Sequence, residues 1–385
     1  MTTTFTPTAG RRSGAGGLFT DQEYARQRAF FTTRVAPTPL VSLPGLAARL
    51  GLGALWVKDE SQRFDLPAFK SLGVEFAVHE LAARGALAGV TTLVCASAGN
   101  HGRAVARCAR HAGLAARVFL DRDVAPARVT AIRSEAAEVV RVEGTYDDAV
   151  RLAADDAART GALVVSDTSW TGYEQIPRDI MLGYTRIMDE AAAAWAREGP
   201  PDLMIVQAGV GGLLAAVASW SARHLGDTRP GLVAVEPVRA ACVQASARAG
   251  ALAAVAGPLT TIMAGLRCGE VSPLAFGVLV DLVDGYVAVD DDWCRAAMRC
   301  FAHPEPGDAP LVVGPSGAAG LAALLAATES VATNALFDAC APRAGRRVFV
   351  IATEGLTEPD LWSAVTGRPT GGRLVPVPDN DDPAD

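Results

Sequence analysis

The stretch ESQRFDLPAFKSLG, residues 60–73, carries a lysine at the point where a polar loop gives way to an apolar helical pattern. The pattern after Lys70 has apolar residues at positions 72, 74, 76, 77, 78 and 81. A lysine amine that lies near the positive end of a helix and is partly removed from water has its charged form disfavoured. A neutral amine can form a Schiff base with an aldehyde cofactor. Lys70 is therefore a candidate attachment point for such a cofactor, although most lysines are solvated surface residues.

Two glycine-rich loops lie downstream, each between a strand-like run and a helical pattern. The first, SAGNHG at residues 97–102, follows the apolar run 92–96. The second, GVGGL at residues 209–213, follows the apolar run 203–206. A strand, a glycine loop and a helix in this order aim backbone N–H groups and a positive helix end at an anion. A lone loop of this kind is most often a tight turn, but two loops after a lysine indicate a phosphate-bearing cofactor.

In this order the chain resembles the fold-type II pyridoxal-phosphate enzymes, the tryptophan synthase β and threonine dehydratase superfamily, and within it the diaminopropionate ammonia-lyases. The stretches that carry the resemblance run collinearly: KDESQRFDLPAFKSLG (58–73), SAGNHGRAVA (97–106), SDTSWTGYEQIPRDIMLGY (166–184), AGVGGLLAAV (208–217), VEP (235–237), TIMAGLRCGE (261–270), GPSGAAGLAAL (314–324) and ATEG (352–355). The resemblance implies an α/β fold of two domains, with mostly parallel sheets flanked by helices and pyridoxal 5'-phosphate between the domains.

The resemblance also assigns roles to individual residues. It implies that Lys70 is the Schiff-base lysine, that Asn100 contacts the phenolic oxygen of the cofactor, and that Thr353 hydrogen-bonds its pyridine nitrogen. It implies that the cofactor phosphate is held by Gly209, Val210, Gly211, Gly212 and Leu213. It implies that the substrate carboxylate is bound by backbone N–H groups of Ser97, Ala98, Gly99, Asn100 and His101. A hydroxyl at the pyridine nitrogen does not keep that nitrogen protonated, which suits quick expulsion of a β-leaving group. The alternative for Thr353 is an ordinary strand residue.

One position departs from the pattern of the diaminopropionate ammonia-lyases. Where they carry an aspartate before Gly-Asn-His this chain has Ala98, while their second acidic position matches Asp167. Two carboxylates on opposite faces of the substrate would remove the α-proton from either enantiomer, so Ala98 leaves one face without a base. The resemblance makes Asp167 the base or acid for an L-amino acid, with Lys70 as the other candidate. A turn or cap is the structural alternative for Asp167.

The composition narrows the class of protein. The 385 residues, of which 50% are hydrophobic, are enough for one large or two medium cores. The net charge is -7, and four acids in the last seven residues leave -3 for the rest (-7 plus 4). We expect no nucleic-acid partner because no basic patch is evident, and no membrane span because the apolar runs are short or interrupted. The first residues lack the apolar region of a secretory signal.

The cysteines favour a reducing compartment, because their number is odd and no signal peptide is evident, so we expect a cytoplasmic protein. The seven are Cys95, Cys108, Cys242, Cys268, Cys294, Cys300 and Cys340. No cysteine or histidine spacing is typical of a metal site, and no metal is expected. The resemblance leaves open a disulfide between Cys242 and Cys268, but the reducing compartment favours free thiols.

Strand-like apolar runs alternate with alanine-rich helical stretches, which is typical of βαβ units and mostly parallel sheets. Strands are expected at 55–58, 92–96, 116–120, 138–142, 162–166, 203–207, 232–236 and 347–352. We expect a disordered arm over residues 1–20 and a disordered acidic tail over residues 374–385. The resemblance implies a homodimer with a large cofactor-binding domain (21–72 and 196–373) and a small mobile domain (73–195).

The leading hypothesis is a pyridoxal-phosphate-dependent α,β-elimination. The substrate would be 2,3-diaminopropionate or a related β-substituted L-amino acid, and the released aminoacrylate would hydrolyse to pyruvate and a second ammonia. Serine or threonine dehydration and β-replacement in a biosynthetic pathway are the enzymatic alternatives. From another class, the alternative is a non-catalytic protein that binds the cofactor or an amino acid. The presence of Lys70, Asn100, both glycine loops and Thr353 argues against that last alternative.

Overall fold

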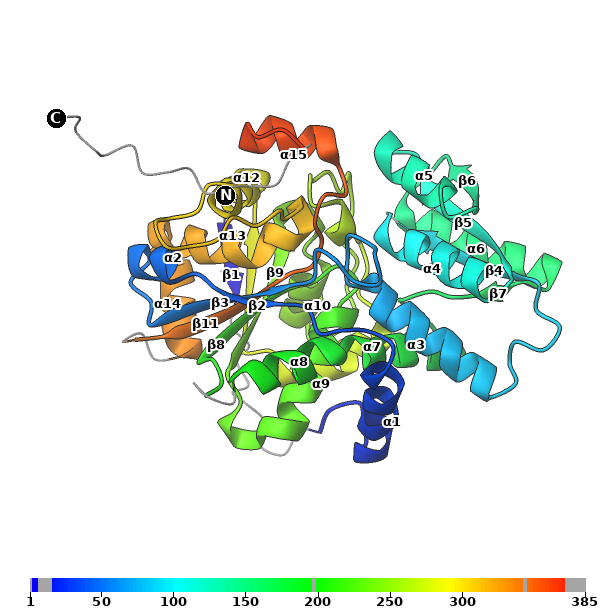
Figure 1. Cartoon of the computed structure of the whole chain (residues 1–385), viewed down its shortest axis with the longest axis horizontal. Helices are drawn as coiled ribbons and strands as arrows, with labels where there is room; N and C mark the ends of the chain where they lie inside the picture. The colour runs from blue at the N-terminus through cyan, green and yellow to red at the C-terminus, as the bar shows by residue number, and fades with distance from the viewer. Residues whose placement is uncertain (1, 6–15, 98, 196–198, 342–344, 371–385) are drawn as a thin grey trace.

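The strands of the protein form two sheets flanked by helices (Figure 1). The computed structural model describes residues 2–5, 16–97, 99–195, 199–341 and 345–370. The large sheet has seven strands in the order β1-β10-β9-β8-β11-β3-β2, and the small sheet has four in the order β6-β5-β4-β7. All pairs in the small sheet are parallel, and the large sheet is parallel except at its two edge strands. The predicted α/β fold class is confirmed.

The predicted strands are all present, with ends that shift by at most two residues. The large sheet contains β1 (Thr2–Phe5), β2 (Leu40–Ser42), β3 (Ala54–Asp59), β8 (Leu203–Gln207), β9 (Gly231–Pro237), β10 (Gly285–Val289) and β11 (Arg347–Ala352). The small sheet contains β4 (Thr92–Ser97), β5 (Ala115–Asp121), β6 (Glu138–Val142) and β7 (Leu163–Val164). Parallel strands need helical crossovers, so each sheet gathers its own helices.

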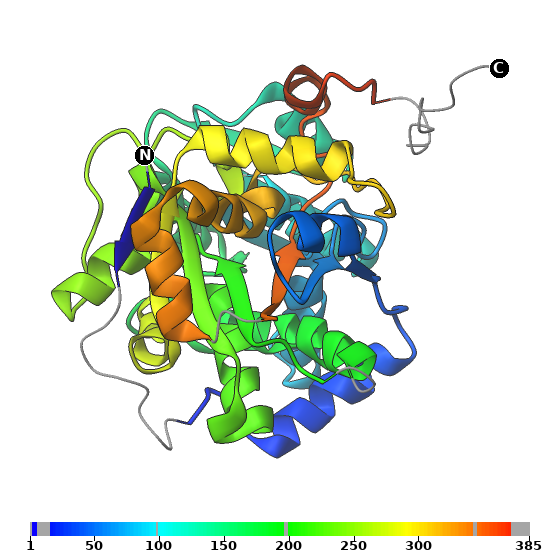
Figure 2. The same cartoon turned by 90° about the vertical axis from the view of Figure 1, so that its left-hand side faces the viewer.

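Helices pack against both faces of the large sheet, and Figure 2 shows α13 and α14 crossing one of them. The helices are α1 (Asp21–Thr32), α2 (Pro44–Arg49), α3 (Lys70–Ala83), α4 (Asn100–His111), α5 (Pro126–Arg133), α6 (Tyr146–Thr160), α7 (Gln175–Tyr184), α8 (Arg186–Trp195), α9 (Gly212–Leu225), α10 (Cys242–Ala249), α11 (Pro273–Leu282), α12 (Asp291–Ala302), α13 (Pro315–Glu329), α14 (Val331–Cys340) and α15 (Pro359–Thr366). Within the described ranges no single helix is long and apolar enough to cross a membrane, although α13 and α14, bent by 114°, meet that test together.

The N-terminal residues correct one expectation. Residues 2–5, expected to belong to a disordered arm, form β1 and pair antiparallel with β10, a strand that the sequence analysis did not predict. Three threonines and a phenylalanine suit a strand, and β10 would otherwise leave its outer edge unpaired. The Phe5 ring lies 5.9 Å from that of Tyr286, between centroids. Residues 6–15 of the expected arm and the whole expected tail lie outside the described residues, and the expected domain boundaries stay a prediction.

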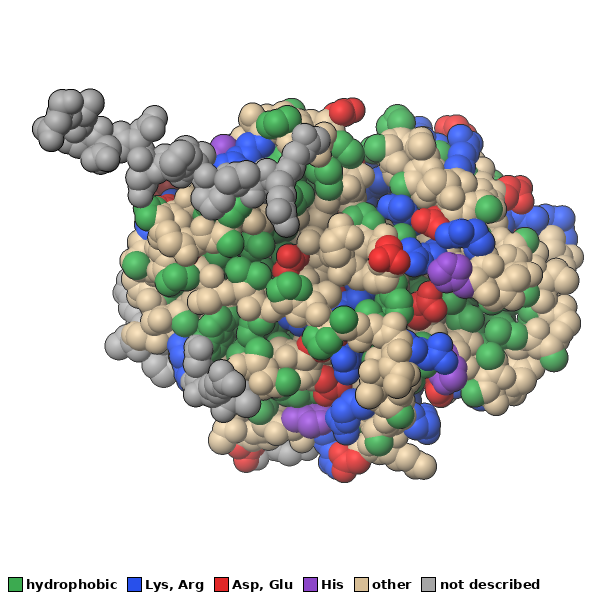
Figure 3. Space-filling model, in the orientation of Figure 1, with side chains coloured by type: hydrophobic (Ala, Val, Ile, Leu, Met, Phe, Trp, Pro, Cys, Tyr) green, Lys and Arg blue, Asp and Glu red, His purple; other side chains and the backbone are tan. Residues whose placement is uncertain are grey.

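Charges of both signs are mixed on the surface. Figure 3 shows basic and acidic side chains interspersed over the half of the molecule that α1, α3 and the small sheet form. Ion pairs account for part of this mixture, for example Arg117 with Glu138 at 2.8 Å and Arg107 with Asp65 at 3.0 Å. A face with interspersed charges does not produce the single-sign field that steers a polyanion.

A buried group of four charges fixes the loop between β3 and α3. Lys58 Nζ lies 3.0 Å from Glu60 Oε1 and 2.8 Å from Glu190 Oε2, and Arg63 Nη2 lies 2.6 and 2.7 Å from the same two oxygens. Burial acts to raise the pKa of Glu190, but hydrogen bonding and charge from Arg63 and Lys58 outweigh it and lower the pKa to about 2. The two cations and two anions balance, and the less buried Arg186 adds a contact of 2.7 Å between its Nε and Glu190 Oε1, so the loop is tied to β3 and α8.

Removing one carboxylate from this group should destabilise the protein strongly. Glu190→Gln leaves two buried cations with a single anion, and we expect a loss of about 3–5 kcal/mol in the free energy of unfolding, measured by urea denaturation. Glu138→Gln, at an exposed ion pair, should cost at most about 1 kcal/mol. Because the pKa of Glu190 falls from 4.5 to about 2 on folding, the deficit of Glu190→Gln should be full above pH 4.5 and shrink as the pH falls towards 2. Equal effects of the two variants at pH 7 would contradict this account.

Candidate active site

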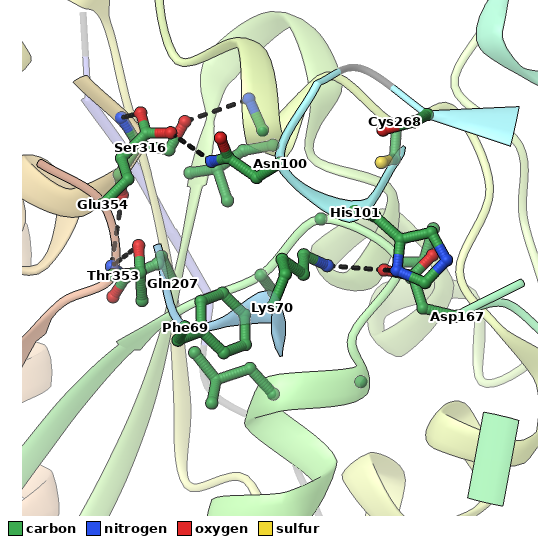
Figure 4. Close-up of a pocket in the computed structure, with 18 of the residues that line it drawn as sticks. Phe69, Lys70, Asn100, His101, Asp167, Gln207, Cys268, Ser316, Thr353 and Glu354 are labelled. Atoms are coloured by element: carbon green, nitrogen blue, oxygen red, sulfur yellow. Dashed lines mark hydrogen bonds and ion pairs between the residues drawn. The ribbon is translucent and has the colours of Figure 1, made fainter. Parts of the chain in front are cut away.

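One cavity is lined by residues that follow the carboxyl ends of strands in both sheets (Figure 4). Open α/β sheets bind ligands at this end. The cavity brings together every described residue that the sequence analysis selected: Lys70, Ser97, Gly99, Asn100, His101, Asp167, Gly209, Val210, Gly211, Gly212, Leu213 and Thr353. Ala98, the remaining candidate, lies outside the described residues. Segments far apart in sequence therefore meet at a single site.

Lys70 begins α3 at the wall of the cavity. The preceding loop turns at Phe64 and Asp65, whose φ angles of 53° and 55° lie in the left-handed region. The backbone N–H of Phe69 then donates to the carbonyl oxygen of Thr353 at 3.2 Å. This bond joins the lysine loop to the residue that follows β11. Because Lys70 directly follows Phe69, this hydrogen bond fixes the position of Lys70 relative to Thr353. Both residues are expected to contact the cofactor.

Lys70 and Asp167 form an ion pair, with 2.5 Å between Nζ and Oδ2. Burial acts to lower the pKa of Lys70, but the charge of Asp167, with Tyr184 and the hydrogen bond, outweighs it and raises the pKa. Burial likewise acts to raise the pKa of Asp167, and the charge of Lys70 outweighs it and lowers the pKa. The expectation that the charged form of Lys70 is disfavoured is therefore wrong for the protein without ligand, because Asp167 compensates for the lost water.

The chain contains only two lysines, Lys58 and Lys70. The side chain of Lys58 is completely buried in the group of four charges described above. The side chain of Lys70 keeps 19% of its surface exposed and lines the cavity. Lys70 is consequently the only lysine placed to react with a ligand there.

Asp167 lies in the irregular segment after β7. The hydroxyl of Tyr173 accepts from the backbone N–H of Ser166 at 2.8 Å and donates to the carbonyl oxygen of Val164 at 2.9 Å. These bonds fix the chain on the N-terminal side of Asp167. His101 Nδ1 lies 3.9 Å from Asp167 Oδ2. Asp167 thus faces an amine and an imidazole.

The first glycine loop carries His101 and Asn100 at the start of α4. The Ser97 hydroxyl oxygen accepts from the backbone N–H groups of Gly99 and Gly102, each at 2.8 Å. His101 Nε2 lies 2.8 Å from the carbonyl oxygen of Val165, which can only accept, so Nε2 carries the proton. Burial lowers the pKa of His101, so the ring is neutral. The N–H groups of Gly99 and Gly102 are engaged by Ser97, which leaves those of Asn100 and His101 at the start of α4 for a ligand.

The second glycine loop has the geometry of an anion cradle. Gly211 has a φ of 94°, and a Cβ there would lie 3.1 Å from a Leu279 methyl carbon. A Cβ at Gly209 would lie 3.1 Å from the carbonyl oxygen of Gly265. The loop leads directly into α9, and the first N–H groups of a helix have no partner within it. The loop therefore needs glycine and presents free donors at the end of a helix dipole.

Glu354 links the two sides of the cavity. Glu354 Oε2 accepts from Asn100 Nδ2 at 2.5 Å and lies 3.3 Å from Arg128 Nη2, while Oε1 accepts from the backbone N–H of Ser316 at 2.9 Å. Arg128, in α5, is buried and also contacts Glu358 at 2.7 Å. One carboxylate therefore holds α4 and α5 of the small sheet against the end of β11 and the start of α13.

The sequence analysis missed several polar residues of the cavity. They are Tyr146, Tyr184, Gln207, Cys268, Ser316 and Glu354. Two of them had a signal: Gln207 ends the strand before the second glycine loop, and Glu354 directly follows Thr353. A polar residue at the carboxyl end of a buried parallel strand is expected to face a site.

All seven cysteines are free, as predicted for Cys242 and Cys268.

These residues fit pyridoxal phosphate. Lys70 supplies an amine for the aldehyde, the Gly209–Gly212 loop supplies donors for a phosphate, and Thr353 supplies a hydroxyl in the same cavity. The Oε1 atom of Gln207 is buried without a hydrogen-bond partner among the described residues, which is unusual in a cavity wall unless a ligand completes it.

Comparison with known proteins agrees with this reading of the cavity. Residues 31–336 match a family described as "Pyridoxal-phosphate dependent enzyme". The chain is 36% identical over 354 residues to the diaminopropionate ammonia-lyase of Salmonella typhimurium, covering 86% of this chain and 88% of that protein. It is 35% identical over 338 residues to that of Escherichia coli K12, with 84% and 85% covered. The E. coli ammonia-lyase crystallised with an aminoacrylate-PLP azomethine reaction intermediate superposes with a TM-score of 0.89 at 32% identity, over 95% of this chain and 97% of that one.

The ion pair of Lys70 and Asp167 predicts how the lysine titrates in the cofactor-free protein. In Asp167→Asn the carboxylate that favours the charged amine is gone, so burial should lower the pKa of Lys70. The amine should then become reactive towards an acylating reagent at a lower pH than in the wild type, measured by mass spectrometry of the Lys70 peptide. Asp123→Asn, at an exposed carboxylate, should leave this pH unchanged.

The same ion pair makes the stability of the fold depend on pH. Since folding lowers the pKa of Asp167 and raises that of Lys70, the pair stabilises the fold from about pH 4 to about pH 10, and it stabilises the fold less below and above that range.

Proposed function

The chain belongs to the family of pyridoxal-phosphate dependent enzymes, and from this premise we propose that it is an ammonia-lyase. Its substrate is 2,3-diaminopropionate or a closely related β-substituted L-amino acid. With water, 2,3-diaminopropionate yields pyruvate and two molecules of ammonia. The observation that carries the proposal is the contact between Lys70 and Asp167 in a cavity that also holds the glycine cradle and Thr353. This site unites an amine for the cofactor with a carboxylate for the proton of the substrate.

The resemblance and the shared cavity together support the residues that would hold the cofactor. Lys70 would bind the aldehyde carbon, Asn100 would contact the phenolic oxygen, Thr353 would contact the ring nitrogen, and residues 209–213 would bind the phosphate. Pyridoxal phosphate, when bound, supplies a conjugated ring that takes up the electron pair of the Cα–H bond. The protein supplies the position of that bond and the groups that move its proton.

Asp167 and Lys70 handle that proton. A general base must lie within hydrogen-bond reach of the proton it removes, and the two groups already lie 2.5 Å apart. When the substrate amine takes the place of the Lys70 amine, either Asp167 or the neutral Lys70 amine accepts the α-proton. If Lys70 accepts it, the carboxylate of Asp167 neutralises the resulting ammonium charge. The β-amine then leaves as ammonia after it takes up a proton from the same pair. His101, neutral and 3.9 Å from Asp167, borders the pair without adding charge.

The substrate carboxylate is bound at the first glycine loop. The N–H groups of Asn100 and His101 begin α4, and the positive end of that helix favours an anion. Asn100 and Arg128 both contact Glu354, so the position of this loop depends on the side of the cavity that β11 forms. Binding of the carboxylate therefore closes the domain of residues 73–195 against the rest, which excludes water from the reaction.

In the cell the enzyme is a cytoplasmic homodimer. Size-exclusion chromatography tests the oligomeric state, and cell fractionation tests the location.

Attachment of the cofactor should depend on Lys70 alone. Reduction of the loaded enzyme with borohydride should fix pyridoxal phosphate to the Lys70 peptide, because the other lysine, Lys58, is buried in ion pairs. Lys70→Ala should lose both the fixed label and turnover, while its thermal unfolding stays close to that of the wild type. A label on another peptide, or turnover by Lys70→Ala, would refute the assignment.

The reaction should be selective for the L-enantiomer. Among the described residues, Asp167 is the carboxylate that pairs with Lys70. By the resemblance, the position that holds an aspartate in the diaminopropionate ammonia-lyases holds Ala98 here. We expect the wild type to release pyruvate from L-2,3-diaminopropionate and to leave the D-isomer largely untouched. Asp167→Asn should slow the L-reaction by at least about 100-fold, the low end of a general base's contribution. Equal rates on both isomers, or a fully active Asp167→Asn enzyme, would return the role of base to Lys70.

A further inference from the structure

Gln207 makes a set of contacts that constrains its neighbour Thr353. It is the last residue of β8, is 2% exposed and lines the cavity. Its Nε2 atom lies 2.8 Å from the carbonyl oxygen of Ile351, 3.1 Å from that of Ser316 and 2.9 Å from Oγ1 of Thr353. Figure 4 shows the Gln207 and Thr353 side chains in contact at the wall of the cavity. The amide thus bridges β8, β11 and the start of α13.

These neighbours decide which way the Gln207 amide points. Carbonyl oxygens only accept hydrogen bonds, and two of them lie within 3.1 Å of the same amide atom. If the amide were turned round, its oxygen would face these oxygens with no proton between them. The NH₂ group must therefore occupy this position.

The direction of the Thr353 proton follows from the orientation of the amide. An amide NH₂ group donates and does not accept, so the Thr353 hydroxyl oxygen is the acceptor in its contact with Gln207. The single proton of Thr353 must point away from Gln207. Within the part of the chain that the structure describes, no group accepts that proton, and Thr353 lines the cavity. The hydroxyl is left as a donor for a ligand that carries a lone pair.

We propose that Gln207 is a positioning residue that forces the Thr353 hydroxyl to donate into the cavity and thereby selects the unprotonated form of the cofactor ring nitrogen. The inference rests on the proposed function, since it takes pyridoxal phosphate as the ligand. A hydroxyl alone accepts or donates, so it tolerates a protonated ring nitrogen as well as a free one. A hydroxyl whose oxygen is committed to Gln207 favours the free nitrogen, because a hydrogen bond to the neutral form disfavours protonation. An unprotonated ring is a weaker electron sink, which suits rapid loss of a β-leaving group.

The test measures the protonation of the ring nitrogen directly. The wild type and its variants are loaded with ¹⁵N-labelled pyridoxal phosphate, and the ¹⁵N chemical shift is followed as a function of pH. Gln207→Met nearly keeps the volume but removes the donor, and frees the carbonyl oxygens of Ile351 and Ser316 to accept the Thr353 proton. The ring nitrogen should then hold its proton to a pH higher by about one unit or more. Lys70, Asp167, His101 and Glu354 are retained in every variant, so the surrounding ionisable groups stay the same.

A double-mutant cycle shows whether Gln207 acts through Thr353. Thr353→Val should produce a similar shift, and Gln207→Met combined with Thr353→Val should shift the titration no further than Thr353→Val alone. Gln244→Met is the matched control, because Gln244 is also buried and donates to a backbone carbonyl, that of Tyr286, away from the cavity. It should change stability without moving the ¹⁵N titration. If Gln207→Met does not fold, Gln207→Asn, which withdraws the amide by one methylene, takes its place with the same expected direction.

The outcomes separate this proposal from the proposed function. A shift in Thr353→Val with none in Gln207→Met, or effects of the two substitutions that add, would overturn the role of Gln207 and leave the cofactor site intact. No response of the ¹⁵N titration to Thr353→Val, or no binding of the labelled cofactor by the wild type, would instead remove the site assignment on which the inference rests. Coupled, non-additive shifts with an unmoved Gln244→Met titration would establish the proposal.

Discussion

The site depends on a balance of buried charge beneath the loop that ends at Lys70. Lys58 and Arg63 share the carboxylates of Glu60 and Glu190, and all four side chains are removed from water. Such a group tolerates little displacement, because any separation leaves a charge unpaired in a medium of low dielectric constant. The loop it fixes is the one whose Phe69 N–H bonds Thr353. The position of the reactive amine is therefore set by ion pairs between residues that do not line the cavity.

The two sheets contribute to one site because charged side chains cross between them. Glu354, after β11, accepts from Asn100 and Arg128 of the small-sheet side, and Arg267 contacts Asp121 at the end of β5 at 2.7 Å. The same carboxylate that receives Arg128 also orients Asn100.

The lysine shows how a local argument can reach the right residue for an incomplete reason. Its place at the start of α3 favours a neutral amine, yet Asp167 at 2.5 Å keeps the amine charged. The carboxylate that raises the pKa of Lys70 is also the group placed to exchange a proton with it. Thr353 shows the converse: its hydroxyl is ambiguous alone and becomes a committed donor beside Gln207.

Local sequence determined the α/β fold, the positions of eight of the eleven described strands, the lysine at a helix start and the two glycine loops. It could do so because hydrophobic periodicity and the need for glycine are properties of neighbouring residues. The pairing of β1 with β10, the ion pair between Lys70 and Asp167, 97 residues apart, and the contact between Gln207 and Thr353, 146 residues apart, came only from the tertiary structure. A pKa and the direction of a hydroxyl proton depend on whichever groups the fold brings within a few ångströms, and no local pattern encodes that distance.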